Sequence, residues 1–185
     1  MKIAVYSGSF NPLHIGHQAI MEYFSADKSY DGMYLVVSPQ NPLKMAQAQP
    51  DGQERYLNAV AALKRHPELK VKPDDIELGM EAPHYTIRTL DALKQREPKN
   101  SFTLVMGADN LANIRRWRDY RRILLEYGVA VYPRQGVDLT AVREELMKEC
   151  PDYRIQLTDA PMVDISSTEI RDGIAAGRDM SEYLM

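Results

Sequence analysis

Two histidines close to the amino terminus, His14 and His17, are spaced so that both could act on one ligand. They end the segment S-G-S-F-N-P-L-H-I-G-H, which joins a short β-branched stretch to residues with helical spacing. Both imidazoles should lie on one side of the first helical turn, beside free backbone N–H groups and the positive end of the helix dipole. Such a turn is an anion site, where imidazoles can donate hydrogen bonds to phosphoryl oxygens as charge builds in a transition state. Taken alone, a pair of surface histidines near a helix start explains the spacing equally well.

Two glycines accompany these histidines, one before them in the loop and one between them. Gly8 and Gly16 let the backbone approach a bound molecule closely. A metal site is the weaker interpretation, because no third ligand of the right type lies nearby.

A second candidate segment, I-S-S-T-E-I-R, covers residues 165–171 near the carboxyl end. It is typical of a helix start: Ser166 or Ser167 can cap free N–H groups, and Glu169 can complete a capping box with Ser166. Arg171 adds a planar fork that suits phosphate oxygens. An ordinary capping box is the alternative when this segment is considered alone.

The elements that must position these segments alternate between strands and helices. Apolar, β-branched stretches predict strands over 2–6, 33–38, 103–106, 129–132 and 155–157. Helical spacing predicts helices over 17–26, 56–63, 87–93, 111–117 and 139–146, and Gly128 suits a helix C-cap. The connections are too long for hairpins, so we expect an α/β fold with a doubly wound parallel sheet, formed by residues 1–185 as a single domain. In such sheets ligands bind at the carboxyl ends of the strands.

Composition limits the function classes. The 185 residues carry a formal net charge of −3, which argues against a general nucleic-acid binder but permits small anionic substrates. No apolar run approaches the length of a membrane span, and the first strand begins almost at Met1, so we expect neither membrane association nor a signal peptide and place the protein in the cytoplasm. The lone Cys150 excludes an internal disulfide, and a small buried hydrophobic role suits it.

Considered together, the segments resemble the nucleotidyltransferase superfamily of the H-x-G-H type. Residues 7–17 are similar to its opening motif, G-[GS]-[ST]-F-D-P-x-H-x-G-H, and residues 165–171 to its carboxyl-terminal I-S-S-T-x-I-R motif. The resemblance implies a Rossmann-like fold in which His14 and His17 act on the transition state. It also implies an ATP site, formed by Gly8, Ser9, Phe10, Ser166, Ser167 and Arg171. Lys44 matches the lysine that ends the family's P-P-H-K turn, where it would meet ATP phosphates; a solvated loop lysine is the alternative.

Two further stretches resemble one branch of this superfamily, the nicotinate-nucleotide adenylyltransferases. H-Y-T-I-R-T-L at 84–90 is similar to their S-Y-T-x-x-T-L, and G-A-D-N-L followed by Trp117 is similar to their G-A-D-x-L…W. The resemblance implies that Gly107 and Asp109 approach a nucleotide ribose while Thr86 and Trp117 frame the pyridine ring. An indole is a good platform for an aromatic ring, and a carboxylate can accept two sugar hydroxyl protons. Trp117 as an ordinary core residue is the alternative.

The implied reaction joins ATP to nicotinate mononucleotide and releases deamido-NAD and pyrophosphate by direct in-line displacement. Mg²⁺ would bridge the ATP phosphates, held mainly by the nucleotide and water and not by a protein site. Three alternative hypotheses for the function are a phosphopantetheine adenylyltransferase, a class I aminoacyl-tRNA synthetase fragment and a non-catalytic nucleotide-binding module. The second is weakened by the missing K-M-S-K-S-like loop and the acidic balance. Oligomeric state is not predicted.

The sequence departs from the family pattern in several places. Asn11 replaces the Asp of F-D-P, Leu43 replaces the His of P-P-H-K, and Arg88 stands where an Asp is common. The family's last helix normally extends past the Y-L-M with which this sequence stops, so a truncated or variant form is expected. A run of five arginines predicts solvated surface and local ion pairs: Arg115, Arg116, Arg118, Arg121 and Arg122.

Overall fold

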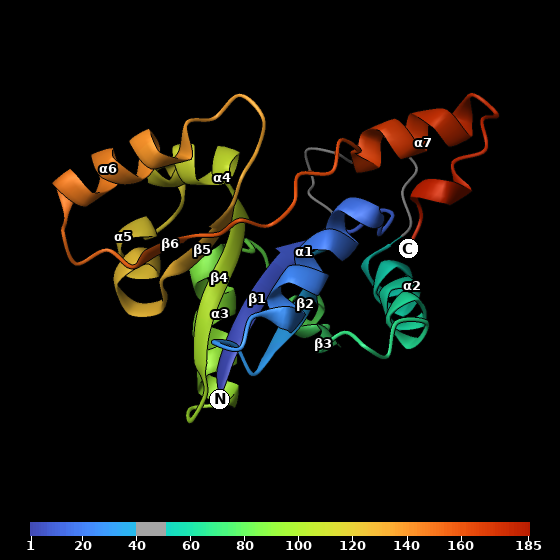
Figure 1. The fold of residues 1–185 in the computed structure, drawn as a ribbon. Coiled ribbons are helices and arrows are strands. Elements are labelled where there is room, and N and C mark those ends of the chain that lie inside the picture. The colour runs from blue at the N-terminus through green and yellow to red at the C-terminus, as the bar shows by residue number, and fades with distance from the viewer. Residues whose placement is uncertain (40–50) are drawn as a thin grey trace.

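The computed structural model describes residues 1–39 and 51–185, and contains a six-stranded sheet in which every pairing is parallel. The strand order is β3-β2-β1-β4-β5-β6, so the order reverses direction between β1 and β4 (Figure 1). The strands are β1 (Lys2–Gly8), β2 (Gly32–Val37), β3 (Val71–Asp74), β4 (Ser101–Gly107), β5 (Val129–Tyr132) and β6 (Ile155–Leu157). This is the predicted doubly wound parallel sheet. Lys44 and Leu43 lie outside the described residues.

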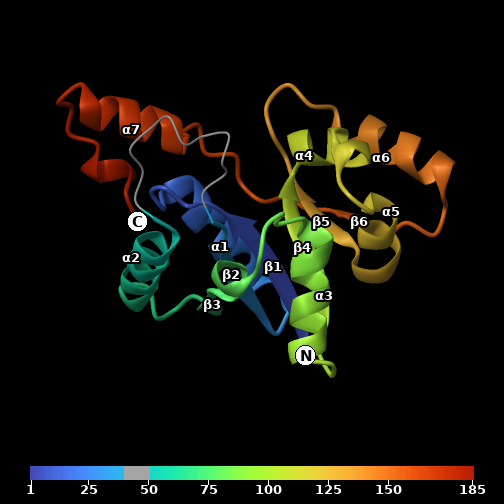
Figure 2. The ribbon, with the colours of Figure 1, turned by 180° about the vertical axis from the view of Figure 1, so that it is seen from behind.

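Helices cover both faces of the sheet. The α-helices are α1 (Ile15–Ala26), α2 (Gly52–Lys64), α3 (Thr86–Arg96), α4 (Ala108–Ala112), α5 (Tyr120–Arg122), α6 (Leu139–Glu149) and α7 (Ser167–Ala175). Shorter 3-10 turns are η2 (Ile76–Gly79), η3 (Ile114–Arg116) and η5 (Ser181–Tyr183), and η4 (Ile123–Tyr127) is a π-helical turn. α7 lies above the start of α1, and the carboxyl terminus returns to α2 (Figures 1 and 2).

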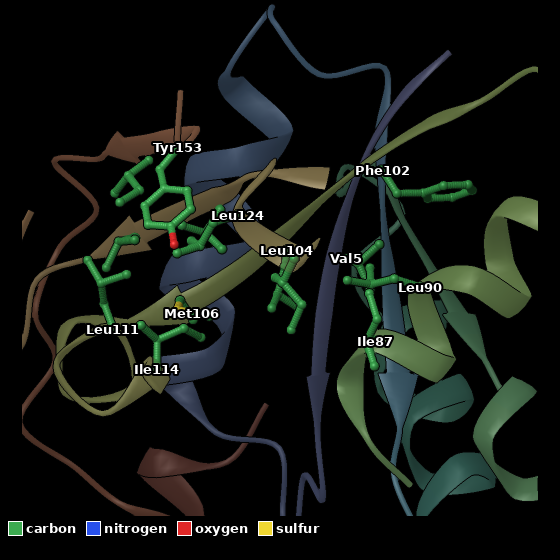
Figure 3. Close-up of a cluster of buried hydrophobic side chains, with 14 of the residues drawn as sticks. Val5, Ile87, Leu90, Phe102, Leu104, Met106, Leu111, Ile114, Leu124 and Tyr153 are labelled. Atoms are coloured by element: carbon green, nitrogen blue, oxygen red, sulfur yellow. The ribbon is translucent and has the colours of Figure 1, made fainter. Parts of the chain in front are cut away.

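The buried strands explain why both faces must be covered. In β1, Ile3 and Val5 belong to one core cluster, while the alternating Ala4 and Tyr6 belong to the other. A strand that is apolar on both sides is typical of a parallel sheet between two helical layers. Figure 3 shows the first cluster, in which α3, α4 and η3 contribute side chains that pack against β1 and β4.

The structure differs from the predicted elements in two places. The edge strand β3 was not predicted, because its sequence V-K-P-D is short and contains Pro73, which a strand tolerates only at an edge or an end. The single helix expected over 111–117 is instead two short pieces, α4 and η3. Leu111 and Ile114 are fully buried, as their spacing suggested, but Trp117 follows η3 in extended backbone (φ −82°, ψ 141°).

Gly128 ends the η4 turn, as predicted for a helix C-cap. Its backbone has φ 80° and ψ 165°, a combination that essentially only glycine adopts without strain. A Cβ at this position would lie 2.9 Å from Arg154 Cβ and 3.2 Å from the Arg154 carbonyl oxygen. The next residue, Val129, begins β5 and donates to that same carbonyl at 2.8 Å, so the backbone has little room to move.

We therefore expect Gly128→Ala to lower the free energy of unfolding by about 2–3 kcal/mol, from backbone strain and the close contact together. Urea denaturation monitored by circular dichroism measures this change. Gly79→Ala is the matched control, since a Cβ there meets nothing within 4 Å of the described structure, and should change stability by less than about 0.5 kcal/mol. Equal effects of the two substitutions would contradict the assignment.

Candidate functional site

The two histidines form a reciprocal cap at the start of α1. His14 is the N-cap residue, in extended backbone, and its Nδ1 accepts the Gly16 N–H at 3.0 Å. His17, in the first turn, accepts the His14 N–H at its own Nδ1 at 3.2 Å. The two rings stack with their centroids 3.7 Å apart. The expected placement of both imidazoles on one side of the first turn is confirmed.

These hydrogen bonds fix which ring nitrogen carries the proton. Because both Nδ1 atoms accept backbone N–H groups, each neutral ring must carry its hydrogen on Nε2. Burial, with a further contribution from Arg134, lowers the pKa of His14 to about 4. Burial and the neighbouring His14 hold the pKa of His17 well below its usual range, again assisted by Arg134. Both imidazoles are therefore neutral N–H donors near pH 7.

A cleft of about 400 Å³ connects this turn to the second motif. Its walls are the His14–His17 turn, Tyr6 near the carboxyl end of β1, the loop after β5 and the segment before α7. A cleft of about 470 Å³ at the amino ends of the strands is lined instead by residues such as Lys2, Ser101 and Gly128, away from both motifs. The cleft at the carboxyl ends is where a doubly wound sheet binds its ligands.

The start of α7 has the predicted cap. Ser166 Oγ accepts the Glu169 N–H at 3.1 Å, and the Glu169 carboxylate accepts the Ser166 N–H at 2.7 Å, which completes the capping box. Ser166 and Ser167 both line the cleft. Arg171 points toward the amino-terminal loop, where its Nη1 donates to the Asn11 carbonyl at 2.6 Å. The structure thus joins the two motifs physically.

The loop after β1 carries Gly8, Ser9 and Phe10. Gly8 closes the strand, whose observed end lies two residues beyond the predicted one. Phe10 is buried, has a positive φ of 47°, and places its ring edge-on against His17 with centroids 5.1 Å apart. None of the three lines the cleft described above, so their predicted contact with ATP stays a prediction.

The predicted mononucleotide residues lie on neighbouring elements. Asp109 Oδ1 is 3.7 Å from Arg134 Nε, and a Cβ on Gly107 would approach Asp109 Oδ1 to 2.6 Å, so Gly107 and Asp109 lie beside the cleft residue Arg134. Trp117 is partly buried against the core cluster that contains Leu111 and Ile114.

Thr86 is the first residue of α3. The segments that hold Thr86 and Trp117 meet through their neighbours, because the Arg118 guanidinium lies 5.1 Å from the Tyr85 ring centroid. Their roles in framing a pyridine ring stay predictions.

Sequence reasoning missed three cleft residues: Tyr6, Tyr132 and Arg134. Arg134 follows the carboxyl end of β5, stacks 5.5 Å over the Tyr132 ring and is close enough to influence both histidines. Tyr6 is buried and its pKa is raised by burial and by Tyr132. The rule that directs attention to loops after strands could have found Arg134. Tyr6 had no distinguishing signal within an apolar strand.

The departures from the family pattern have visible consequences. Asn11 is buried, and its side-chain Nδ2 has no hydrogen-bond partner among the residues described. Arg88 donates to the carbonyls of Glu81 and Pro83, and so braces the loop before α3.

Three of the five arginines form ion pairs, and the pair Arg122–Glu126 is local as expected. The other partners are distant in sequence: Glu149 for Arg115 and Arg121, and Asp91 for Arg122. Cys150 is partly buried against the core and free, in agreement with its predicted role.

Comparison with known proteins decides the family. The sequence profile of the cytidylyltransferase-like family matches residues 5–173. Nicotinate-nucleotide adenylyltransferase is the name of a Flavobacterium johnsoniae relative that is 38% identical over 184 residues, 100% of this chain and 92% of the relative. A Bacteroides fragilis relative of the same name is 37% identical, over 99% of this chain and 87% of its own. This chain belongs to the nicotinate-nucleotide adenylyltransferases.

The fold agrees with this assignment. The solved Plasmodium falciparum nicotinic acid mononucleotide adenylyltransferase, complexed with NaAD, superposes with a TM-score of 0.77 at 19% identity, covering 99% of this chain and 90% of that one. A likeness at that identity concerns the fold alone. The sequence relatives, not the fold, favour the nicotinate branch over the phosphopantetheine and tRNA-synthetase hypotheses.

The residues placed in the structure contain neither a candidate membrane span nor a cluster of metal ligands. No helix within 1–39 and 51–185 is long and apolar enough to cross a membrane. Across the same ranges, no group of three or more His, Cys, Asp and Glu side chains is arranged to hold a metal ion.

The lowered histidine pKa values make a prediction for stability. The unfolded chain protonates His14 near its ordinary pKa of about 6.5, whereas the folded chain does so only near 4, so the unfolded state binds more protons between these values. The free energy of unfolding should therefore fall as the pH is lowered from 7 to 5. Each histidine contributes a slope that approaches about 1.4 kcal/mol per pH unit.

Urea denaturation at pH 7, 6 and 5 measures this slope. In the variant His14→Asn the cap is kept by a side chain that does not titrate, so its slope should be shallower by about one proton. Identical slopes for the two proteins would show that His14 is not held neutral by the fold.

Proposed function

We propose that His14 and His17 donate their Nε2–H groups to the phosphoryl oxygens of ATP while its adenylyl group passes to nicotinate mononucleotide. One observation carries this proposal: two neutral, stacked imidazoles share a cleft with the capped start of α7. Relatives named nicotinate-nucleotide adenylyltransferase match the full chain and support the reaction itself, which forms deamido-NAD for NAD biosynthesis. Fixed N–H donors aimed at developing negative charge are among the strongest catalytic devices in enzymes.

In the proposed reaction, a 5′-phosphate oxygen of the mononucleotide attacks the α-phosphorus of ATP. A new phosphorus–oxygen bond forms as the bond to the bridging oxygen of the leaving group breaks, and pyrophosphate departs with that electron pair. No protein nucleophile takes part. The chain's contribution is to hold two anions in line, which can supply roughly 7–11 kcal/mol, and to donate hydrogen bonds to the transferring group.

In this proposal, different residues bind the different parts of the two substrates. Ser166, Ser167 and Arg171 hold the ATP phosphates at the start of α7, together with Gly8, Ser9 and Phe10 from the end of β1 and the loop after it. Lys44, which lies outside the described residues, adds a point charge for the same phosphates in this proposal. Asp109 and Gly107 receive the ribose, and Thr86 and Trp117 frame the pyridine ring. Arg134 lies between the histidines and Asp109, and so adds positive charge where the two substrates meet.

We propose that Mg²⁺ binds together with ATP. The donor set of the cleft does not suit a resident ion, since both Nδ1 atoms already accept backbone N–H groups and both Nε2 atoms carry hydrogen. When bound, Mg²⁺ would neutralise charge on the phosphates, held mainly by their oxygens and by water.

The reaction is tested by measuring pyrophosphate release from ATP with each of three acceptors under the same Mg²⁺ conditions. The acceptors are nicotinate mononucleotide, its amide counterpart and phosphopantetheine. We expect turnover with nicotinate mononucleotide at a kcat/KM roughly 10- to 150-fold above that for its amide counterpart, because hydrogen bonds to a charged carboxylate are worth about 1.5–3 kcal/mol. The first N–H groups of α3, at Thr86 and Ile87, lack a side-chain cap in the described structure and are suitable donors. An amide would turn its NH₂ toward such a donor.

A ratio near one, or a preference for the amide, would contradict deamido selectivity but leave adenylyl transfer intact. Release with phosphopantetheine alone would favour the rival transferase. ATP binding without release from any acceptor would favour a nucleotide-binding module.

The roles of the histidines are tested by His17→Ala and His17→Asn. Both variants lose the Nε2–H donor, so kcat should fall at least 100-fold, in line with about 2.7–4 kcal/mol for one transition-state donor. An asparagine side chain at this position can still accept the His14 N–H, which makes His17→Asn the control for loss of the cap. ATP affinity, measured by calorimetry, should change little in the His17→Asn variant. Near-normal turnover in either variant would exclude the donor role.

A further inference from the structure

Side chains from two helices hold the backbone carbonyls of the loop that follows β1. Arg55 Nη1, from α2, donates to the Ser9 carbonyl at 2.7 Å, and Arg171, from α7, donates to the Asn11 carbonyl at 2.6 Å. Ser167 Oγ donates to the Pro12 carbonyl at 3.2 Å. Arg171 and Ser167 already belong to the predicted ATP site, whereas Arg55 was not singled out by any motif. Its contact is the one that orients the Ser9–Phe10 peptide.

Arg55 is unusual for an arginine because it is almost entirely buried, with 2% of its surface exposed. It lies in the first turn of α2, behind the N-cap Asp51, and side chains in a helix lean toward the amino terminus, here toward the carboxyl ends of the strands. Burying a guanidinium is costly unless its N–H groups find acceptors. Besides Ser9, Nη1 donates to the Ser38 carbonyl at 2.8 Å, so one buried nitrogen joins the loops after β1 and β2.

The position of the Ser9 carbonyl determines the direction of the next N–H group. In a trans peptide the C=O and N–H point in opposite directions, so the Phe10 N–H is turned away from Arg55. Within the described structure, the N–H groups of Ser9 and Phe10 donate no hydrogen bond. Phe10 has a left-handed backbone (φ 47°), and successive N–H groups around such a residue form a concave anion-binding nest.

The same loop also supports a histidine. The Phe10 ring packs edge-on against the His17 ring and against the Tyr6 ring, with centroids 5.1 and 5.3 Å apart. If the Ser9–Phe10 peptide rotated, the Phe10 N–H would point in another direction. The Phe10 ring beside His17 would shift as well.

We infer that Arg55 is a positioning residue for the triphosphate: by holding the Ser9 carbonyl from behind, it keeps the Phe10 N–H group available to phosphate oxygens. This inference rests on the proposed function, because it assigns the loop after β1 to ATP. Arg55 itself is buried behind the loop and acts through the backbone.

The test compares Arg55→Met, which keeps much of the bulk without a donor, with Arg55→Lys, which keeps a charged donor. We expect Arg55→Met to raise the KM for ATP at least 20-fold and to leave the KM for nicotinate mononucleotide within twofold. Arg55→Lys should recover much of this loss, with a KM for ATP about three- to fivefold above that of the parent protein. Calorimetric titration with ATP should show the same order.

Leu93→Ala is the control for general destabilisation. Leu93 is fully buried in α3, remote from the loop, so its truncation should lower the melting temperature without changing the KM for ATP. A control that raises this KM as much as Arg55→Met would overturn the inference, as would an unchanged KM in Arg55→Met or a Lys variant no better than Met.

Two further outcomes keep the test decisive. If Arg55→Met does not fold, Arg55→Lys carries the test, and an unchanged KM for ATP in that variant would overturn the inference. If the parent protein releases no pyrophosphate with any acceptor, the proposed reaction fails, while ATP titration of the parent and Arg55→Lys still tests the loop. Equal ATP affinities in that titration would overturn the role of Arg55.

Discussion

Each imidazole at the start of α1 accepts a backbone N–H at Nδ1, and the properties of the site depend on this pair of contacts. They fix the orientation of the rings, hold them in one stack and leave hydrogen on Nε2. A protonated ring would have no lone pair for the backbone N–H, so the cap itself favours the neutral form. Burial acts in the same direction. The helix start thereby supplies neutral donors whose direction does not change when a substrate arrives.

The rest of the fold keeps this turn in place. β1 lies near the centre of the sheet between β2 and β4, both of its faces are buried, and the loop that leaves it is held by α2 and α7. These contacts join segments about 45 and 160 residues apart in sequence to one short loop. By contrast, the Asp109–Arg134 pair is half exposed, and exposed ion pairs contribute little stability. Asp109 and Arg134 lie beside the cleft, so this pair is better suited to bind a ligand than to stabilise the fold.

Sequence reasoning predicted what depends on local pattern. The strands, the sheet class, the capping box at Ser166 and the C-cap at Gly128 follow from periodicity and from residues with special backbone preferences. It did not predict β3, whose proline-containing stretch is a strand only because β2 lies beside it. The broken helix before Trp117 kept its apolar spacing but not its backbone. Arg55 could not be recognised, because its role comes from carbonyls that tertiary structure brings together, whereas Arg134 could have been found by searching the loops after strands.

Nitrogen-15 NMR of the imidazole rings at pH 7 tests the central claim most directly, because the shifts of Nδ1 and Nε2 report which nitrogen carries hydrogen. The structure predicts that His14 and His17 are both neutral, with hydrogen on Nε2 and an unprotonated Nδ1 that accepts a backbone N–H. A doubly protonated ring, or hydrogen on Nδ1 in either residue, would contradict the reciprocal cap and with it the proposed donors to the transferring phosphoryl group.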